Sequence, residues 1–482
     1  MDSVSIREVG RIKEIRKSIV KIEGLPNCML GQLINLGGGT KGFIMGFSEN
    51  DVLVLLLGAS TAIKSGDEVT SEEETFNIPV GKNFIGRIVN PLCQPLDGKG
   101  RIKEDGNACI FRDASSILDR VPIEEMLVTG IRIIDSSIPI GKGQRQLIIG
   151  DRMTGKTSIA VDTMINQKKK DVICIYCCVG HDYASFEKVM TTFKAAGVFD
   201  YSIVVAALAS SSIGEQYLAP YAAAALGEYF MYSGRHVLVV FDDLTKHAWA
   251  YRELSLLLER APGREAYPGD IFYLHAQLME RGAKLSPKMG GGSMSFLPIV
   301  DTLQGDIAGF IPTNTISMTD GQIFLSSTLF AEGFKPAIDV GLSVSRIGNK
   351  VQPPVLRALT KDVELGYIQY RELLKATRLR ASFSEELNAR LAHGEKIERV
   401  FMQEKARPSP VAEQIILFYA LKKGILDNIS DGECEEFKNN IFAFAEKNYP
   451  ELTARLEIAV EFTEADKANL DGCITRFFRE KG

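Results

Sequence analysis

The spacing of hydrophobic and polar positions changes twice along the chain, and the first stretch predicts a small barrel. Over residues 1–70, short apolar runs alternate with turn residues, as in "SIVKIEGL", "GQLINL", "GTKGFIMGF", "NDVLVLLLG" and "KSGDEVT". Short strands at this regular spacing are typical of a closed antiparallel barrel. We therefore predict an N-terminal β-barrel domain over residues 1–70.

The second and third stretches predict an α/β domain followed by helices. Over residues 71–350, apolar strands such as "RQLIIG", "DVICIYCCVG", "YSIVVAAL" and "HVLVVFDD" alternate with longer helical patterns. This alternation favours a mostly parallel sheet covered by helices. Over residues 351–482, segments such as "ELGYIQYRELLKATRLRASF" and "SPVAEQIILFYALKKGIL" have helical periodicity. We predict a multidomain chain that ends in a C-terminal helical bundle.

Composition narrows the classes of function. The 482 residues are enough for about three domains. The net charge of -5 lacks the basic surplus of proteins that bind nucleic acid, so we expect no nucleic-acid partner. The chain has neither an apolar run long enough for a membrane span nor a signal-peptide pattern at its start, which predicts a soluble chain. Its eight cysteines lack zinc spacing, and we interpret those in "DVICIYCCVG" as buried, reduced thiols.

A phosphate-binding loop is the clearest chemical motif. The segment "IIGDRMTGKTSIA" contains the pattern G-x-x-x-x-G-K-[ST] between an apolar strand and a helical pattern. The glycines let backbone N–H groups face phosphate oxygens, and the start of the helix adds positive potential. Lys156 suits the β and γ phosphates, and Thr157 suits Mg²⁺. The predicted nucleotide-binding residues of this loop are Gly150, Asp151, Arg152, Met153, Thr154, Gly155, Lys156, Thr157 and Ser158.

The segment "HVLVVFDD" is an apolar strand pattern that ends in two acidic residues, Asp242 and Asp243. Asp242 comes first after the strand and suits the carboxylate of the Mg²⁺ site, so we predict metal binding by Thr157 and Asp242. Asp243 is interpreted as a helix cap or structural acid. Hydrolysis also needs a group that orients the attacking water. In one branch of P-loop ATPases a glutamate does so directly after the glycine at the end of the strand corresponding to "DVICIYCCVG", and this chain has His181 after Gly180. We interpret His181 as a loop histidine and consider a role for Asp182 doubtful.

At this point the chain resembles the α-subunit family of the rotary F-type ATP synthases. The resemblance covers nearly the whole chain. It rests on "VGRIKEI", "GLPN", "PIGKGQRQLIIGDRMTGKTSIAVDT", "FDDLTKHAWAYRELSLLLERAPGREAYPGDIFYLHAQLMERGAKL", "GGGSMSFLPIVDT", "IPTNTISMTDGQIFL" and "PAIDVGLSVSRIG". It implies a barrel of the six-stranded type, a RecA-like P-loop domain and a helical C-terminal domain.

The resemblance also implies a function for the chain inside a larger enzyme. An α subunit binds ATP or ADP with Mg²⁺ without turning it over. Three α subunits alternate with three catalytic β subunits in an α3β3 ring. The ring surrounds a central-shaft γ subunit, holds a peripheral-stalk subunit, and couples ATP synthesis or hydrolysis to H⁺ or Na⁺ translocation. Membrane contact is implied only through other subunits, at the cytoplasmic face of a bacterial plasma membrane.

Several individual residues take roles from this resemblance. Phe330, Lys335, Gln403 and Lys405 fall at the positions around adenine. Arg346, with Ser345 and Ser343 beside it, matches the arginine that reaches into the catalytic site of the neighbouring subunit. A planar, permanently charged guanidinium is also the group that best stabilises negative charge spread over phosphoryl oxygens.

The chain departs from the family pattern at several positions. Met153 replaces a usual Gln, and the run from His181 to Tyr183 replaces Gln-Lys-Arg. Lys405 replaces a Gln and Lys335 a frequent Arg, and either change could alter base preference. About 25 residues common at the family's start are absent, so we expect the peripheral stalk to dock differently.

Two other classes of function compete with this interpretation. A self-sufficient homohexameric ATPase would need the water-orienting Glu that is missing after Gly180, and a nucleic-acid motor would also need a basic, aromatic barrel face. A nucleotide-sensing scaffold would keep the phosphate loop and leave Arg346 without a role. ATPase activity of the chain alone and with a catalytic partner discriminates between these classes.

Overall fold

The computed structural model describes residues 8–58, 63–71, 76–377, 385–458 and 461–480. The expectation about the start of the chain falls partly on residues 1–7, which lie outside this description. The chain divides into two compact units. The first contains residues 1–122, 169–301 and 306–319, and the second contains residues 123–168, 302–305 and 320–482.

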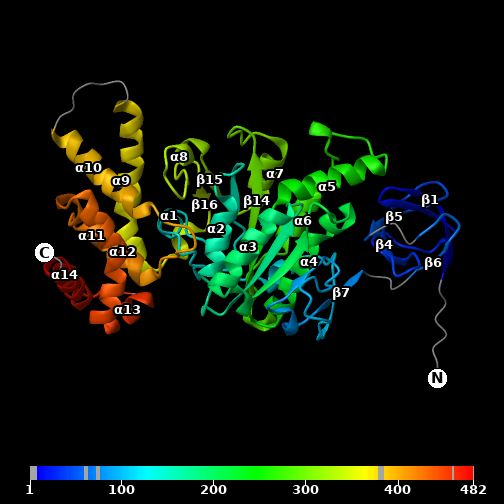
Figure 1. Ribbon diagram of the computed structural model, residues 1–482, viewed down its shortest axis with the longest axis horizontal. Helices are drawn as coiled ribbons and strands as arrows, with labels where there is room; N and C mark the ends of the chain where they lie inside the picture. Colours follow the sequence, from blue (N-terminus) through cyan, green and yellow to red (C-terminus); the bar gives the residue numbers. More distant parts are fainter. Residues whose placement is uncertain (1–7, 59–62, 72–75, 378–384, 459–460, 481–482) are drawn as a thin grey trace. The chain divides into compact units, whose positions relative to one another are not determined.

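A closed six-stranded barrel begins the first unit (Figure 1, blue). Its strands follow the order β1-β2-β5-β4-β3-β6 and are β1 (Val9–Arg16), β2 (Ile19–Glu23), β3 (Leu33–Asn35), β4 (Lys41–Phe47), β5 (Val52–Leu57) and β6 (Glu68–Ser71). Alternate residues of these strands point inward, and Ile12, Val20, Ile34 and Val54 lie in the shared core. The predicted barrel is confirmed, with β1 as a strand that the apolar runs did not indicate.

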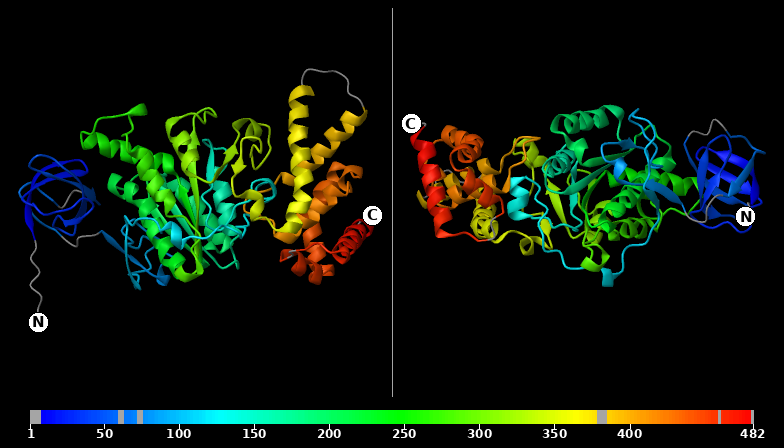
Figure 2. Two further views of the ribbon diagram at one scale, coloured as in Figure 1. Left: turned by 180° about the vertical axis from the view of Figure 1, so that it is seen from behind. Right: turned by 90° about the horizontal axis from the view of Figure 1, so that it is seen from below.

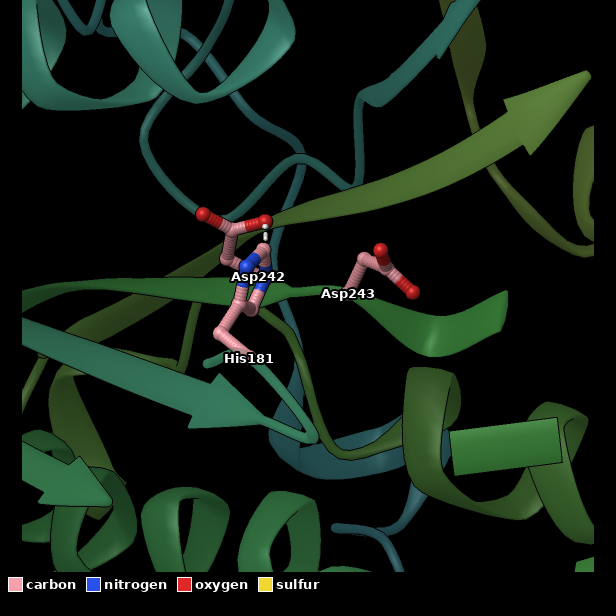
Figure 3. A group of neighbouring side chains, drawn as sticks. All are labelled: His181, Asp242 and Asp243. Atoms are coloured by element: carbon pink, nitrogen blue, oxygen red, sulfur yellow. Dashed lines mark hydrogen bonds and ion pairs between the residues drawn. The ribbon is translucent and has the colours of Figure 1, made fainter. Parts of the chain in front are cut away.

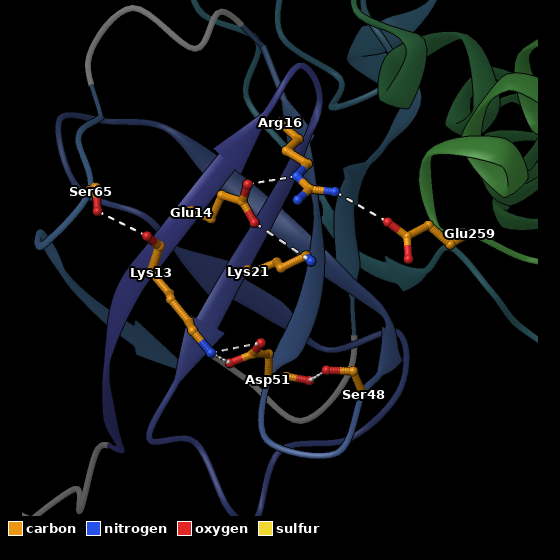
Figure 4. Close-up of polar contacts among 8 residues, drawn as sticks. All are labelled: Lys13, Glu14, Arg16, Lys21, Ser48, Asp51, Ser65 and Glu259. Atoms are coloured by element: carbon orange, nitrogen blue, oxygen red, sulfur yellow. Dashed lines mark hydrogen bonds and ion pairs between the residues drawn. The ribbon is translucent and has the colours of Figure 1, made fainter.

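Charged residues pair on the outer face of this barrel. Lys13 of β1 contacts Asp51 at 2.9 Å, and Glu14 accepts a hydrogen bond from Arg16 at 2.6 Å (Figure 4). Arg16 also reaches Glu259, which lies outside the barrel in the same unit, at 3.2 Å. These exposed pairs contribute little to stability, and they keep polar groups on the solvent side of β1.

Five parallel strands form the centre of the first unit. Their order is β14-β13-β11-β12-β8, with bounds β8 (Ile88–Val89), β11 (Val172–Val179), β12 (Ser202–Ala207), β13 (His236–Asp242) and β14 (Ser293–Thr302). Every residue of β11 and β12 is buried, as expected for parallel strands covered on both faces. The carboxyl ends of β11 and β13 run in register, with Cys178 paired to Asp242. This register brings the ends of two predicted motifs together.

Helices cover these strands, and the longest is α4 (Ile213–Tyr232). It contacts β11, β12 and β13 and begins at a capping box formed by Ser212 and Glu215. This unit also contains β7 (Asn77–Val80), which pairs antiparallel with β9 (Gly106–Cys109), and the helices α3 (Tyr183–Ala196), α5 (Leu244–Leu257), α6 (Ile271–Glu280) and α7 (Phe310–Met318). The alternation of strands and helices predicted for the central region is confirmed.

The second unit combines three strands with helices at the end of the chain. β10 (Leu147–Asp151) pairs in parallel with β15 (Gly321–Leu325), which pairs antiparallel with β16 (Val344–Ser345). Short helices α1 (Arg132–Ser137), α2 (Lys156–Ile165) and α8 (Ser327–Ala331) accompany these strands.

The C-terminal part of this unit is helical (Figure 2, yellow to red). Its helices are α9 (Pro354–Thr377), α10 (Glu385–Phe401), α11 (Val411–Lys422), α12 (Asp431–Asn448), α13 (Pro450–Glu457) and α14 (Glu464–Arg479). Helix α11 is buried along most of its length and contacts α9, α12 and α13. The predicted fold class of barrel, α/β domain and C-terminal helices is therefore confirmed. Over the described ranges, no helix combines the length and apolar character needed to cross a membrane.

Candidate nucleotide-binding site

The phosphate loop joins β10 to α2 in the second unit. At Gly150 a side chain would place its Cβ 2.6 Å from the Leu325 carbonyl, so the neighbouring strand leaves room only for glycine. Gly155 has a φ of 101° at the N-terminal end of α2, a conformation that glycine adopts without strain. The loop therefore turns sharply into the start of a helix, which is the geometry that binds anions.

Lys156 lies folded over this loop. Its ammonium group donates hydrogen bonds to the carbonyl oxygens of Gly150 at 2.9 Å and Asp151 at 2.6 Å. The side chain of Asp151 accepts hydrogen bonds from the Thr302 hydroxyl at 2.6 Å and the Gly305 N–H at 2.7 Å. Burial opposes ionisation of Asp151, but these hydrogen bonds outweigh it and hold the pKa of its carboxyl below the usual value. Asp151 thus braces the loop rather than facing outward.

The middle of the loop is exposed to solvent. Met153 is 91% exposed and has a positive φ of 63°, and Arg152 beside it is also exposed. Thr154 is buried and donates a hydrogen bond to the Asp151 carbonyl at 2.7 Å. The loop therefore presents backbone and one flexible apolar side chain at its tip.

A cavity of about 480 Å³ lies beside the end of the loop, within the second unit. Thr154, Gly155 and Ser158 line it on the loop side. The four residues predicted for the base, Phe330, Lys335, Gln403 and Lys405, line the same cavity. The ammonium group of Lys335 lies 4.9 Å from the centre of the Phe330 ring. The structure thus brings the residues predicted to surround the base together with the phosphate loop, although they lie far apart in the sequence.

The side-chain amide of Gln403 is already hydrogen bonded inside the protein. Its Nε2 donates to the carbonyl oxygens of Gly130 and Arg407, each at 2.7 Å. Its Oε1 accepts a hydrogen bond from the Arg132 N–H at 3.1 Å. An amide has only two N–H donors, and both of those of Gln403 are in use.

Two further residues of the cavity, Asp162 and Arg132, were missed by sequence reasoning. Asp162 of α2 accepts a hydrogen bond from the Ala406 N–H at 2.9 Å, and burial raises its pKa to about 6. Arg132 is 4% exposed and lies 3.7 Å from Glu413. Burial lowers its pKa to about 10. The helical spacing of α2 places Asp162 one turn beyond Ser158, which is the sequence signal that could have found it.

Asp242 ends β13 in the first unit, and two side chains, Tyr176 and His181, hold its carboxylate. Figure 3 shows the contact with His181. Tyr176 of β11 donates a hydrogen bond to Oδ2 at 2.7 Å, and His181 Nε2 lies 3.0 Å from Oδ1. Burial favours the neutral imidazole of His181, but the hydrogen bond and charge of Asp242 outweigh it and raise the pKa of His181. The sequence did not indicate this pairing, since the two residues are 61 positions apart.

Asp243 and Asp182 are both helix caps. Asp243 accepts a hydrogen bond from the Lys246 N–H at 2.7 Å at the start of α5, which confirms its interpretation as a cap. Burial, with the charges of Asp301 and Asp242, raises its pKa to about 7. Asp182 caps α3 by accepting hydrogen bonds from the N–H and hydroxyl of Ser185, each at 2.8 Å. His181, Asp242 and Asp243 place their ligand atoms within 4.8 Å of one another, so this cluster offers oxygen and nitrogen donors to a cation.

Arg346 lies at an exposed turn that follows β16. Its backbone N–H donates to the Asp320 carbonyl at 2.9 Å, and the Asp320 carboxylate is paired with Arg145 at 2.7 Å. Among the described residues, none accepts a hydrogen bond from the Arg346 guanidinium. The backbone of Arg346 is thus fixed while its charged group faces solvent.

The serines before Arg346 anchor this turn. Ser345 donates a hydrogen bond to the Pro139 carbonyl at 2.8 Å and accepts from Gln144 Nε2 and the Gly348 N–H, each at 3.0 Å. Ser343 donates to the Asp339 carbonyl at 2.6 Å and accepts from the Phe324 N–H at 2.9 Å. Both hydroxyls are therefore engaged within the second unit.

Comparison with known proteins gives the class to which this fold and loop belong. Residues 130–345 match the nucleotide-binding domain of the ATP synthase alpha/beta family, residues 5–72 match its beta-barrel domain, and residues 352–477 match its C-terminal domain. The chain belongs to the ATP synthase alpha/beta family.

Within this family the chain falls among the α subunits. It is 45% identical to ATP synthase subunit alpha of Clostridium acetobutylicum over 468 residues, which cover 97% of this chain and 93% of the relative. It is thus a nucleotide-binding part of an ATP synthase, an enzyme complex that makes ATP and transports ions, and its partners are other subunits of that complex.

Proposed function

We propose that this chain is the regulatory, non-catalytic α subunit of a rotary F-type ATP synthase. It holds a nucleotide in its own site and completes the active site of a neighbouring β subunit with Arg346. The observation that carries this proposal is the fixed turn after β16, which presents an exposed guanidinium that no described side chain neutralises.

In its own site, the chain binds ATP or ADP. The loop residues Gly150, Asp151, Arg152, Met153, Thr154, Gly155, Lys156, Thr157 and Ser158 surround the phosphates, and Phe330, Lys335, Gln403 and Lys405 surround the base. The cavity beside the loop supports this assignment because the base-binding residues and Ser158 share its wall. Lys156 turns from the carbonyls of its own loop toward the phosphates when a nucleotide binds.

Thr157 and Asp242 hold the Mg²⁺ ion that accompanies the nucleotide. Mg²⁺ prefers oxygen ligands and retains water, and both residues offer oxygen atoms. Asp242 fits this role because Tyr176 and His181 orient its buried carboxylate. When bound, Mg²⁺ supplies charge that neutralises the phosphate oxygens.

The site does not turn nucleotide over by itself. His181 lies two residues after the end of β11, where a water-orienting acid would be needed. One of its ring nitrogens is engaged with Asp242, and Asp182 points into its own helix cap. His181 has no carboxylate, and the carboxylate of Asp182 is occupied by the cap, so neither residue activates water.

Arg346 acts on the neighbouring subunit. Its guanidinium stabilises charge on the phosphoryl oxygens during ATP synthesis or hydrolysis, which in related enzymes accelerates the reaction by about 10³ to 10⁵-fold. Ser345 and Ser343 are positioning residues because their hydroxyls fix the backbone just before Arg346. Catalysis at the β subunit is then coupled to ion translocation through the rest of the complex.

We also propose an assembly that the family membership supports. Three copies alternate with three β subunits around a central γ shaft, a peripheral-stalk subunit holds the ring, and the membrane is reached only through other subunits at the cytoplasmic face of a bacterial plasma membrane. We further propose domain limits of 1–70, 71–350 and 351–482. The family matches over residues 5–72, 130–345 and 352–477 support these limits.

ATPase activity of the purified chain, alone and after mixing with a catalytic β subunit, tests this function. We expect no sustained turnover by the chain alone and strong turnover after mixing. Sustained turnover by the chain alone would contradict the proposal and would make the self-sufficient motor the leading interpretation.

A further inference from the structure

A buried carboxylate, Asp135 of α1, fixes a turn that leads into the wall of the nucleotide cavity. Its Oδ1 accepts hydrogen bonds from the N–H and the hydroxyl of Thr129 at 2.9 and 2.7 Å. Its Oδ2 accepts from the Gly130 N–H and from Gln414 Nε2, each at 2.8 Å. Burial raises the pKa of this carboxyl, and the hydrogen bonds act in the opposite direction by stabilising its ionised form. A fully buried carboxylate is stable only while such donors surround it, so Asp135 and the turn hold each other in place.

The peptide of Gly130 in this turn holds both ends of a second segment, the loop 403–409. The Gly130 carbonyl accepts hydrogen bonds from Gln403 Nε2 at 2.7 Å and from the Ser409 N–H at 2.8 Å. A side chain at Gly130 would place its Cβ 2.6 Å from Cβ of Pro408, so the turn also packs directly against this loop. Most residues of the loop 403–409 line the nucleotide cavity. A shift of the Gly130 peptide would therefore move this part of the cavity wall.

Helix α11 is tied to the same turn and the same loop by one side chain. The amide of Gln414 donates to Asp135 Oδ2 and, at 3.0 Å, to the Ser409 carbonyl. An amide has two N–H donors, and Gln414 uses both in this way. Asp135, Gly130 and Gln414 thus form one hydrogen-bond network that joins α1, α11 and the loop 403–409.

We propose that Asp135 is a positioning residue of the nucleotide site, which holds the loop 403–409 in place through Gly130 and Gln414 and so strengthens nucleotide binding. This inference rests on the proposed function, because it concerns the wall of the same cavity. The phosphate loop is braced separately, since Asp151 accepts hydrogen bonds from Thr302 and Gly305. Loss of Asp135 therefore weakens the contacts to base and ribose and spares those to the phosphates.

Trypsin digestion of the purified full-length chain without nucleotide tests the hold on the loop. Lys405 is exposed in the loop 403–409, and a protease cleaves such a segment when it opens locally. Asp135→Asn puts an N–H donor where the carboxylate accepts. Because losing one hydrogen bond to a charged group shifts an equilibrium constant by about tenfold, we expect cleavage after Lys405 to become about tenfold faster. Mass spectrometry of the fragments at successive times gives the rate.

Displacement of a fluorescent nucleotide measures the effect on binding. An ATP labelled on its ribose with N-methylanthraniloyl is bound first and then displaced by MgATP or by inorganic tripolyphosphate with Mg²⁺. We expect Asp135→Asn to raise the dissociation constant of MgATP by about tenfold and that of tripolyphosphate by less than about twofold. Tripolyphosphate has neither the base nor the ribose, so it reports on the phosphate loop alone.

Two further variants separate positioning from a general loss of stability. Asp466→Asn is the matched control, because Asp466 is 1% exposed and accepts hydrogen bonds from Thr463 at the start of α14, away from the cavity wall. We expect Asp466→Asn to change neither cleavage after Lys405 nor the ratio of the two dissociation constants. Gln414→Leu keeps the carboxylate of Asp135 and removes only its link to α11. We expect it to change both quantities in the same direction as Asp135→Asn by about threefold, and it decides the question where Asp135→Asn does not fold.

The outcomes distinguish this inference from the proposed function. Wild-type cleavage after Lys405 in both Asp135→Asn and Gln414→Leu would overturn the hold on the loop. Equal weakening of MgATP and tripolyphosphate in these variants would indicate general damage and would overturn the positioning role, while the proposed function would stand. Failure of MgATP to displace the probe from the wild-type chain would overturn the proposed nucleotide site and this inference with it, even where the cleavage rates show that Asp135 holds the loop.

Discussion

At the scale of single residues, Arg346 is the side chain whose loss has the clearest expected effect. We expect Arg346→Ala to lower ATPase turnover of the assembled ring by about 10³-fold or more, because the charge on the phosphoryl oxygens loses its partner. The ring itself should still form, because the backbone of this turn is held by Asp320 and Ser345. Steady-state ATPase rates and size-exclusion profiles of the same preparation measure both effects.

A nearby cation provides the control for this prediction. Lys350 is exposed and lies four residues after Arg346 in the same turn region. Lys350→Ala removes one positive charge there, and we expect turnover close to that of the wild type. Near-normal turnover in Arg346→Ala would refute the role of Arg346 in catalysis.

Predictions for single residues were confirmed where the contacts are made with residues nearby in the sequence. Asp243 was interpreted as a cap from its place between a strand and a helical pattern, and it caps α5. The contacts of His181 were not predictable in this way, because its partner Asp242 comes from the end of a neighbouring strand. The same holds for Gln403, whose three hydrogen bonds come from two other segments.

At the scale of elements, a buried ion pair joins α4 to the residue after α6. Glu228 accepts two hydrogen bonds from Arg281, at 2.7 and 2.8 Å, and Arg281 also donates to the Ile110 carbonyl. Both side chains are at most 4% exposed. Removing one partner leaves the other charge buried and unpaired, so we expect Glu228→Gln to lower the free energy of unfolding by about 3 kcal/mol.

Urea unfolding followed by circular dichroism measures this loss. Glu464→Gln is the matched control, because it makes the same change in an exposed pair with Lys467. We expect no measurable shift of the unfolding midpoint for Glu464→Gln. Equal midpoints for both variants would show that burial of the Glu228 pair does not matter.

A second element-level prediction concerns two buried histidines between α4, α5 and α6. His247 Nε2 contacts the Tyr217 carbonyl and its Nδ1 contacts His275 Nε2, each at 3.0 Å. Because a carbonyl only accepts, His247 carries its proton on Nε2 and accepts from His275. Burial lowers the pKa of His247 to about 4, and it lowers the pKa of His275 in the same direction.

The pH dependence of stability follows from these lowered pKa values. Below about pH 6.5 the unfolded chain binds a proton at His247 that the folded chain does not bind until about pH 4. Stability from this residue is therefore lost as the pH falls through that window. We expect the stability of the wild type relative to His247→Gln to drop by about 2 kcal/mol between pH 7 and pH 5.

The comparison with His247→Gln is needed because other groups titrate in the same range. Asp243 and Asp162 have raised pKa values, of about 7 and about 6, and they act in the opposite direction as the pH falls. Parallel curves for wild type and variant over this range would contradict the assignment to His247. Urea titrations at pH 7, 6 and 5 provide the curves.

Elements with a strong apolar signal were predicted well, and those without it were missed. The run "DVICIYCCVG" became β11 (Val172–Val179), because a continuous apolar run suits a strand buried on both faces. Strand β1 (Val9–Arg16) was missed because charged residues occupy its outer face and leave only Gly10 and Ile12 fully buried. Strand β8 has two residues, too few for any periodicity.

At the scale of the whole molecule, nucleotide binding should stabilise the fold. A ligand at 100 times its dissociation constant adds about 2.7 kcal/mol to the free energy of unfolding. We expect saturating MgATP to raise the melting temperature of the purified chain and Lys156→Ala to abolish this shift, because Lys156 is the loop residue proposed to hold the β and γ phosphates. Differential scanning fluorimetry with and without MgATP measures it.

The same variant separates the two kinds of site in an assembled ring. We expect Lys156→Ala to lower the initial ATPase rate far less than Arg346→Ala does. An equal loss in both variants would indicate that the site of this chain is itself catalytic. A thermal shift retained in Lys156→Ala would place the nucleotide elsewhere on the chain.

How much of the molecule could be predicted depends on the distance over which its contacts act. The order of barrel, α/β domain and helices was readable because each has its own spacing of apolar residues. The phosphate loop was readable because its chemistry lies in one short segment. The cavity was not, since Ser158, Phe330 and Lys405 come from three segments that only the fold brings together.

The reactivity of the three thiols of β11 can report local unfolding of the sheet. Cys174, Cys177 and Cys178 are fully buried, and burial raises the pKa of each thiol well above its usual value. A thiol must be ionised and accessible to react, so an alkylating reagent cannot modify these side chains while the strand is covered. Alkylation of a β11 thiol would therefore report that the sheet had opened to solvent, independently of catalytic turnover in the rest of the complex.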